Sequence, residues 1–494
     1  MVLLVSVVFF SLARAHLVRM GMARVRCQLV RPDSAPLSRV FQVLRAHVIR
    51  CGPILMLGLL IWGHSTCAAQ SQPSASIPSG ADGWVRKTDS QAFAASKQTP
   101  SAYSPERAAQ AIAYAQALYR LHFIRFAWTT AVLILLLRLG VAPRLRNWAE
   151  SIAHDRFLQA LIFVPAFLLT LDVLLLPVNV ASHWVQGHFG QSIQGWGSWF
   201  WDETKGDVLV AAAGAFVAWL VYAIMRRSPR RWWFYGWLGM LPVTVFSSFV
   251  SPLLIDPLFF HFTPLADSRP DLVKQIERVV ARSGQHIPEN RIFLMDASRK
   301  VQVLNADMTG IGGSARVVVW DTAVARLTPP EILVVFGHEL GHYVLRHTVQ
   351  GLLFSMALLF LVSWVSFHAT RWAVRRFGDA WGLRGVEDWA SLPVLLLLLI
   401  VLIFASTPAQ NAFDRHLEHQ ADQYGLEVVH GIVPNSSEVA AESFKILAEA
   451  DLAEPSPSSF AKVWFYNHPP LDERIRFAYD YNPWAPGRSP QFVK

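Results

Sequence analysis

Six long apolar segments constrain the fold of this chain more than any other feature of its sequence. Each segment is close to the length of about 20 apolar residues that a helix needs to cross a bilayer. The composition agrees, because 53% of the 494 residues are hydrophobic and 16% are charged, whereas soluble domains carry about 25% charged residues. We therefore expect a mainly α protein built on a multi-span bundle of membrane helices. The expected spans are 123–141, 157–180, 208–225, 233–254, 352–367 and 392–407.

Arginine-rich loops indicate how the bundle is oriented. The loops at 226–231 and 371–384 are the most basic, and the loop at 144–156 is weaker. Cytoplasmic loops of membrane proteins are enriched in Lys and Arg, so we place these three loops in the cytoplasm. The segments 255–350 and 410–494 then lie on the other side, which is the periplasmic side if the membrane is a bacterial inner membrane. These loops also account for the net charge of +9, and we expect no nucleic-acid partner.

The first 69 residues read as a secretory signal or, alternatively, as a retained membrane segment. Arg45 and Arg50 precede an apolar core at 52–62, and small residues follow up to Ala69, which is the order of a signal peptide. All three cysteines of the chain lie in this stretch. If it is removed, a metal can be held only by histidines and carboxylates.

The remaining chain divides by composition into spans and aqueous parts. Within the first aqueous part we expect a helix at 272–283 and short strands at 291–295 and 316–320. The predicted order is an exposed linker and amphipathic helix at 70–120, four membrane helices at 121–256, a first catalytic part at 257–350, two membrane helices at 351–409 and a second catalytic part at 410–494.

The most informative motif is His338-Glu339-Leu-Gly-His342. Thr328, Pro329 and Glu331 predict the start of its helix through a capping box and a proline at the first position. Two histidines four residues apart project from one helical face, and both can reach one Zn²⁺ at about 2.0–2.1 Å. The residue after the first histidine, Glu339, lies close enough to take a proton from the attacking water. The alternative, a solvated face with two ordinary histidines, fits poorly because the helix is otherwise apolar.

A third ligand is expected just beyond the last span. Glu418 and Asp422 lie four residues apart in this segment, so Glu418 would complete an open His₂Glu site. Asp422 would then accept the free ring N–H of a ligating histidine. His416 and His419 are rival third ligands, and a charged surface helix with paired side chains is the structural alternative.

These motifs together resemble the membrane zinc metallopeptidases typified by the CAAX prenyl endoprotease, with a bacterial-type member as the nearest description. The likeness covers roughly residues 105–480. Further segments match the family in the same order: Phe262-Thr263-Pro264-Leu265, Asp296-x-Ser298, Asn305-Ala306, Gly310-x-Gly312, Val317 to Thr322 and His468-Pro469-Pro470-x-x-x-Arg474. The resemblance implies a helical bundle enclosing a chamber, with a small α+β, gluzincin-like catalytic domain and zinc at the inner wall.

The resemblance also implies a role for each matching residue. It makes His338, His342 and Glu418 the ligands of one Zn²⁺ per chain, Glu339 the general base and Asp422 a partner of the ligands. Asn305 and Ala306 would lie on an edge strand that pairs with substrate backbone. His468 and Arg474 would lie near the developing oxyanion or the carboxylate end of the substrate. The chain departs from the family at Asp414, where the family often has Ser, and at Val301-Gln-Val-Leu304, so substrate preference does not carry over.

The predicted function is that of an integral-membrane zinc metalloendopeptidase acting on a peptide or protein substrate. A membrane quality-control or chaperone-like component that binds clients at the metal is the alternative. A transporter fits less well, because the spans lack paired Gly/Pro breaks at matching positions. The natural substrate and the recognition of a lipid or prenyl group stay open.

Overall fold

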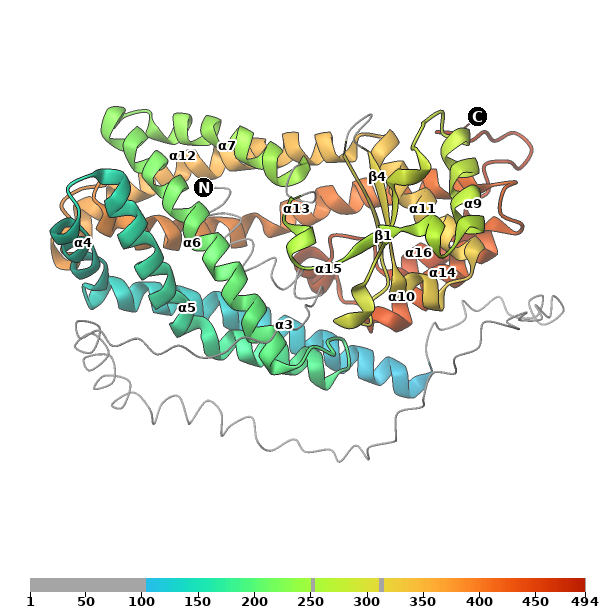
Figure 1. Ribbon diagram of the computed structural model, residues 1–494, viewed down its shortest axis with the longest axis horizontal. Coiled ribbons are helices and arrows are strands. Elements are labelled where there is room, and N and C mark those ends of the chain that lie inside the picture. The colour runs from blue at the N-terminus through green and yellow to red at the C-terminus, as the bar shows by residue number, and fades with distance from the viewer. Residues whose placement is uncertain (1–103, 250–253, 311–314, 494) are drawn as a thin grey trace. The chain divides into compact units, whose positions relative to one another are not determined.

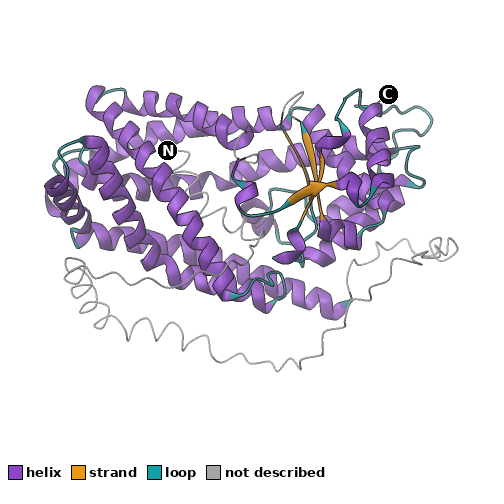
Figure 2. Ribbon diagram, viewed as in Figure 1, coloured by secondary structure: helices purple, strands orange, loops and turns teal. Residues whose placement is uncertain are grey.

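The structure is a computed structural model that describes residues 104–249, 254–310 and 315–493. The predicted signal or membrane segment at 1–69 and most of the linker after it lie outside these residues. Within them, helices dominate and a single small sheet is present (Figures 1 and 2).

Five helices are long and apolar enough to cross a membrane: α3 (Pro105–Arg138), α5 (Arg156–His188), α6 (Trp196–Arg227), α12 (His347–Trp381) and a final segment, Trp389–Val429. That segment consists of the short helix η7 (Trp389–Ser391) and α13 (Leu392–Val429). These helices correspond to five of the six predicted spans, although the first span, 123–141, was predicted to run three residues past the end of α3. The fold class predicted from the sequence, mainly α with membrane helices and a small α+β part, is confirmed.

The sixth predicted span corresponds to α7 (Trp232–Phe249), which packs along α12 (Figure 1). It has 18 described residues, which include three tryptophans and Pro242. It is not among the membrane-length helices of the described chain, so its crossing stays a prediction.

Two helices continue through positions where the sequence predicts a boundary between a membrane span and a neighbouring segment. The amphipathic segment predicted before residue 121 and the first span form one helix, α3, which starts at the N-cap Ser104. The last span and the segment with the predicted third ligand likewise form one helix, α13, with Pro408 inside it. A carboxylate expected in a separate catalytic part is therefore built on the continuation of a membrane helix.

The end of the bundle far from the sheet is held by a buried polar network. Arg146, on the connecting helix α4 (Val141–Ile152), pairs with Asp388 just before η7, and both side chains are buried. Nearby, the Trp389 indole N–H donates to Gln159 at 3.2 Å. Because a buried ion pair is costly to break, this network fixes where α13 begins.

The small sheet has four strands in the order β1-β2-β4-β3. Strands β1 and β2 are antiparallel, β2 and β4 are parallel, and β3 is antiparallel to β4. The local pattern predicted β2 and β4 within one residue, because both are apolar runs. It missed β1, and β3 was expected only through the family resemblance. The strands are β1 (Phe262–Pro264), β2 (Ile292–Met295), β3 (Ala306–Thr309) and β4 (Arg316–Trp320).

Helices pack on one face of this sheet around an apolar core that includes Ile276, Val317, Val319 and Phe336. The two central helices are α9 (Pro270–Arg282) and α11 (Pro329–Val344). The others in this part of the chain are α10 (Asp321–Arg326), α14 (Ser436–Asp451), α15 (Ser459–Phe465), α16 (Leu471–Asp480) and the short turns η2 (Asp256–Leu258), η3 (Leu265–Asp267), η4 (Glu289–Arg291) and η5 (Ala297–Arg299).

Candidate metal centre

Helix α11 begins as the sequence predicts. Thr328 is its N-cap, and the Thr328 N–H donates to the Glu331 carboxylate at 2.7 Å, which completes a capping box. Apolar residues such as Ile332 and Phe336 face the sheet core. The face that carries His338 and His342 is therefore turned away from the sheet, toward α13.

Three glycines let α11 and α13 cross closely at this point. A Cβ atom on Gly425 would lie 2.9 Å from the His338 backbone nitrogen, and one on Gly337 would lie 3.0 Å from a Val429 methyl group. A Cβ atom on Gly341, inside the motif itself, would lie 3.0 Å from Tyr424 Cβ. The close approach places the histidines of α11 directly opposite the carboxylates of α13.

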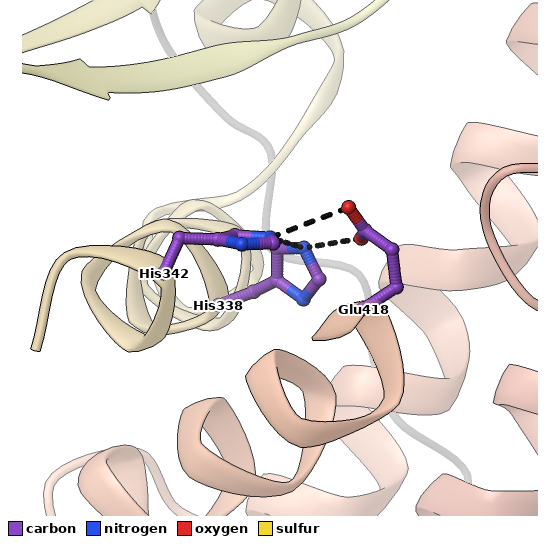
Figure 3. A group of neighbouring side chains, drawn as sticks. All are labelled: His338, His342 and Glu418. Atoms are coloured by element: carbon purple, nitrogen blue, oxygen red, sulfur yellow. Dashed lines mark hydrogen bonds and ion pairs between the residues drawn. The ribbon is translucent and has the colours of Figure 1, made fainter. Parts of the chain in front are cut away.

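The predicted ligand atoms converge between the two helices (Figure 3). The Nε2 atoms of His338 and His342 are 3.1 Å apart. Glu418 lies with Oε2 at 3.2 Å from His338 Nε2 and Oε1 at 3.5 Å from His342 Nε2. In the described chain these three residues form the one group able to offer three ligand atoms to an ion.

The spacing of these atoms suits a small tetrahedral ion. Ligands at about 2.0–2.1 Å from such an ion lie about 3.4 Å from one another, close to the separations given above. One oxygen of Glu418, Oε2, is buried and accepts no hydrogen bond from the described residues. A buried carboxylate whose two oxygens face two imidazole nitrogens is well suited to bind a cation. The residues therefore fit the predicted metal.

His338 has a charged partner on its other ring nitrogen. Its Nδ1 lies 2.8 Å from Asp422 Oδ1, and the Arg474 guanidinium bonds both oxygens of the same carboxylate, at 2.6 and 2.9 Å. All three side chains are buried, with Asp422 only 3% exposed. The carboxylate fixes the ring orientation of His338, while Arg474 balances the charge that this buried carboxylate introduces.

His342 has a different partner, which the sequence analysis missed. Its Nδ1 lies 3.0 Å from His347 Nδ1, and His347 Nε2 lies 3.1 Å from Gln420 Oε1. On a continuous helix, His347 would point about 140° away from His342. The helix instead breaks at Leu345 and Arg346, and α12 starts at His347. Helical periodicity alone could not reveal this contact.

Glu339 lies beside the ligands without joining them. Its Oε1 is 3.9 Å from His338 Nε2. Burial raises the pKa of the Glu339 carboxyl above its ordinary value of 4.5, although the neighbouring histidines pull it down. A carboxylate with a raised pKa at this position is suited to accept a proton at neutral pH.

Of the other predicted site residues, His468 and Arg474 lie beside this centre. His468, in the loop before α16, has Nε2 at 3.2 Å from Glu418 Oε2. Arg474 contacts Asp422, on the far side of His338 from Glu418. The sequence predicted both His468 and Arg474 to lie near the substrate, but in the structure His468 contacts Glu418 and Arg474 contacts Asp422. Asn305 and Ala306 lie at the start of β3, one of the two edge strands of the sheet.

The rival third ligands, His416 and His419, face elsewhere on α13. Both are exposed. His419 packs its ring against Phe477 with centroids 4.5 Å apart, and His416 contacts Gln420 at 3.3 Å. Of the three candidates, only Glu418 belongs to the converging group.

Two family models match most of the described chain. The model described as peptidase family M48 matches residues 266–481, and the model described as "CAAX prenyl protease N-terminal, five membrane helices" matches residues 89–261. The match of the first covers strands β2, β3 and β4, helix α11 and the carboxylates of α13.

Individual proteins show the same likeness. The chain is 33% identical to "Uncharacterized metalloprotease YhfN" of Bacillus subtilis over 380 residues, which cover 76% of this chain and 86% of the relative. It is 28% identical to "CAAX prenyl protease 1 homolog" of Oryza sativa over 75% of this chain and 87% of the relative. Among solved structures, the S. mikatae Ste24p crystal structure matches with a TM-score of 0.67 at 24% identity, covering 77% of this chain and 91% of that one.

Proposed function

Because this chain belongs to peptidase family M48 and is an integral membrane metalloprotease, we propose that it is a zinc-dependent endopeptidase in which Glu339 is the general base. Its substrates are peptides or proteins. The observation that carries the proposal is the convergence of two imidazole Nε2 atoms and one carboxylate at separations of 3.1, 3.2 and 3.5 Å.

The donor set favours zinc with an open position. Two histidines and one glutamate are the ligands of catalytic zinc sites that keep a place for water or substrate. One Zn²⁺ per chain, held by His338, His342 and Glu418, would polarise the scissile carbonyl and acidify the attacking water. Glu339 takes the proton from that water and later delivers it to the leaving amine. Its raised pKa makes both steps feasible near neutral pH.

His468 is proposed to stabilise negative charge on the reacting carbonyl oxygen. Its side chain is half exposed and approaches the site from the side of Glu418, where a donor can reach a developing oxyanion. Arg474 is proposed to act through Asp422, because its guanidinium is buried against that carboxylate. We assign Asp422 and Arg474 to the support of the ligands.

The edge strand β3 is proposed to bind the substrate backbone. The Trp320 N–H donates to the Asn305 carbonyl at 3.2 Å, and the register pairs Asp307 with Val318. Because hydrogen-bonded and non-bonded pairs alternate in an antiparallel ladder, the backbone groups of Ala306 and Met308 point to the open edge. These two residues can therefore add a substrate strand, whereas Asn305 can contribute only its side chain.

The zinc site is proposed to face the periplasm of a bacterial inner membrane. Helices α3 and α6 end at the arginine-rich loops, and α5 and α13 begin near them. Helix α12 starts at His347, beside the metal centre, and ends in the basic segment before Trp381. The site and the basic loops thus lie at opposite ends of a 35-residue helix, which is about 50 Å long. Basic loops favour the cytoplasmic side.

The alternative is a chaperone-like component that binds clients at the metal without cleaving them. A cleavage assay on the purified protein in detergent separates the two. We expect an unfolded protein substrate to be cut, a chelator to stop cleavage and added zinc to restore it. Glu339→Gln should retain zinc and lose at least about 10²-fold in kcat/KM. Cleavage by this variant at the wild-type rate would contradict the assignment of Glu339, and binding without cleavage by the wild type would favour the chaperone.

A further inference from the structure

We propose that His347 and Gln420 set the tautomer of His342, so that His347 is a positioning residue of the metal centre. This inference rests on the proposed function, because it concerns how one ligand is prepared for the ion. His347 is the first residue of α12, and Gln420 lies on α13 between the predicted ligand Glu418 and Asp422. Their side chains meet behind His342, on the side away from Glu418.

The direction of the hydrogen bonds follows from the orientation of the Gln420 amide. Its Oε1 faces His347 Nε2 at 3.1 Å, and its Nε2 faces His416 at 3.3 Å. An oxygen can only accept, so His347 must carry its proton on Nε2. A neutral His347 then presents an unprotonated Nδ1 to His342.

His342 must donate the hydrogen bond that His347 Nδ1 accepts. The two Nδ1 atoms are 3.0 Å apart, which requires one proton between them. Because His347 Nδ1 accepts, His342 carries its proton on Nδ1 and leaves Nε2 with a free lone pair. That Nε2 is the atom facing His338 and Glu418. The amide of Gln420 therefore prepares His342 in the only neutral tautomer that can bind a metal from this side.

The two histidine ligands are thus oriented by unlike partners. His338 donates to the Asp422 carboxylate, which is paired with Arg474, whereas His342 donates to a neutral imidazole. His347 is as deeply buried as Asp422, with 3% of its surface exposed. Burying a second charge beside the first ligand would be costly, and a neutral acceptor fixes the tautomer without that cost.

A break in helical geometry at Arg346 places His347 in this position. Arg346 has φ 58° and ψ 37°, in the left-handed region, which few residues other than glycine adopt. This residue turns the chain between α11 and α12 so that His347 lies beside His342. Ring centroids of the two histidines are 5.0 Å apart.

The test compares zinc affinity of the intact protein in detergent, measured by competition with a chelator of known affinity. His347→Phe keeps an aromatic ring but removes the acceptor, and we expect zinc to bind about 10–100-fold more weakly. His347→Asn places an amide oxygen where Nδ1 stood, and we expect it to recover most of the affinity. His368→Phe makes the same change at an exposed site on the same helix and should bind zinc as the wild type does.

A spectroscopic readout separates positioning from general loss of structure. Cobalt in place of zinc gives visible absorption bands that depend on ligand geometry, and His347→Phe should change these bands while His347→Asn should not. Zinc affinity and cobalt bands of His347→Phe equal to those of the wild type would overturn the inference. Absence of zinc from the wild type would instead overturn the proposed function, so the two failures are distinct.

A second variant covers the case in which His347→Phe does not fold. Gln420→Leu removes the oxygen that fixes the His347 proton and leaves both imidazoles in place. We expect weaker zinc binding than in the wild type, by a smaller factor than for His347→Phe. Wild-type affinity in Gln420→Leu would overturn the role assigned to that amide.

Discussion

At the scale of single residues, the metal centre depends on which nitrogen of each imidazole carries its proton. Both predicted histidine ligands present Nε2 to Glu418, and both have a polar partner on Nδ1. The shared helical face of His338 and His342 was predictable because a spacing of four residues on a helix puts two side chains on one face. His347 was not, because its contact depends on a helix break that no local pattern announced.

Removing the charge of Asp422 tests the support of His338. In Asp422→Asn the amide can still accept from His338 Nδ1, but the buried Arg474 loses its counter-charge. We expect zinc affinity to fall about 10–100-fold and the melting temperature to drop. The matched control is Asp271→Asn, whose carboxylate is 91% exposed and whose loss should change neither quantity. Unchanged zinc affinity in Asp422→Asn would contradict the role of this carboxylate.

The pH dependence of kcat/KM follows from the direction of the Glu339 shift. Burial raises the pKa of Glu339 above 4.5, and the deprotonated carboxylate is the active base. Activity is therefore full above the raised pKa and is lost as pH falls through it. We expect the acid limb of the pH profile of kcat/KM to lie above pH 4.5. An acid limb at or below that value, with zinc still bound, would contradict Glu339 as the base.

At the scale of elements, the site is made by the crossing of α11 and α13. The sequence placed Glu418 correctly on a helix, but it divided that helix from the membrane span before it, because the apolar pattern ends near Thr407. The structure continues α13 through Pro408 to Val429. The apolar composition of a segment indicates whether it lies in the bilayer or in water. A helix that leaves the bilayer therefore changes composition, although its backbone stays helical.

The edge strand shows a second limit of the sequence. Strand β3 spans Ala306–Thr309, and its residues Ala-Asp-Met-Thr lack the β-branched and aromatic enrichment that marks a strand in the sequence. Asn305 and Ala306 were identified through family resemblance, while the open-edge role of Met308 follows from the register with β4. Pairing between strands is a tertiary property that a single strand does not encode.

Gly425→Ala tests the close crossing directly. The added methyl group would lie 2.9 Å from a backbone nitrogen of α11, so the helices must separate. We expect a loss of about 1–3 kcal/mol in unfolding free energy together with weaker zinc binding, measured by thermal unfolding and chelator competition. Gly351→Ala on α12 meets nothing within 4 Å and should be neutral or slightly stabilising. Equal effects of the two substitutions would contradict the crossing as the determinant of the site.

At the scale of the whole molecule, the described chain combines membrane helices with a candidate metal centre on a continuous framework. Helices α12 and α13 each join a membrane-length segment to residues of the centre, His347 and Glu418 respectively. The position of the site relative to the bilayer is therefore set by how these two helices cross it.

Cysteine accessibility tests the proposed orientation. Arg230 and Glu289 are exposed residues, in a basic loop and in the sheet region respectively. With the native cysteines replaced, we expect a membrane-impermeant thiol reagent added to intact cells to label Glu289→Cys and to spare Arg230→Cys until the membrane is opened. The reverse labelling pattern would place the metal centre in the cytoplasm.

The most direct test of the central claim is the zinc content of the purified protein and two variants, measured by elemental analysis after dialysis. The convergence of His338, His342 and Glu418 predicts one zinc per chain in the wild type, little in Glu418→Ala and wild-type content in His419→Ala. A wild type without zinc, or a Glu418→Ala protein that keeps its zinc while His419→Ala loses it, would contradict the account.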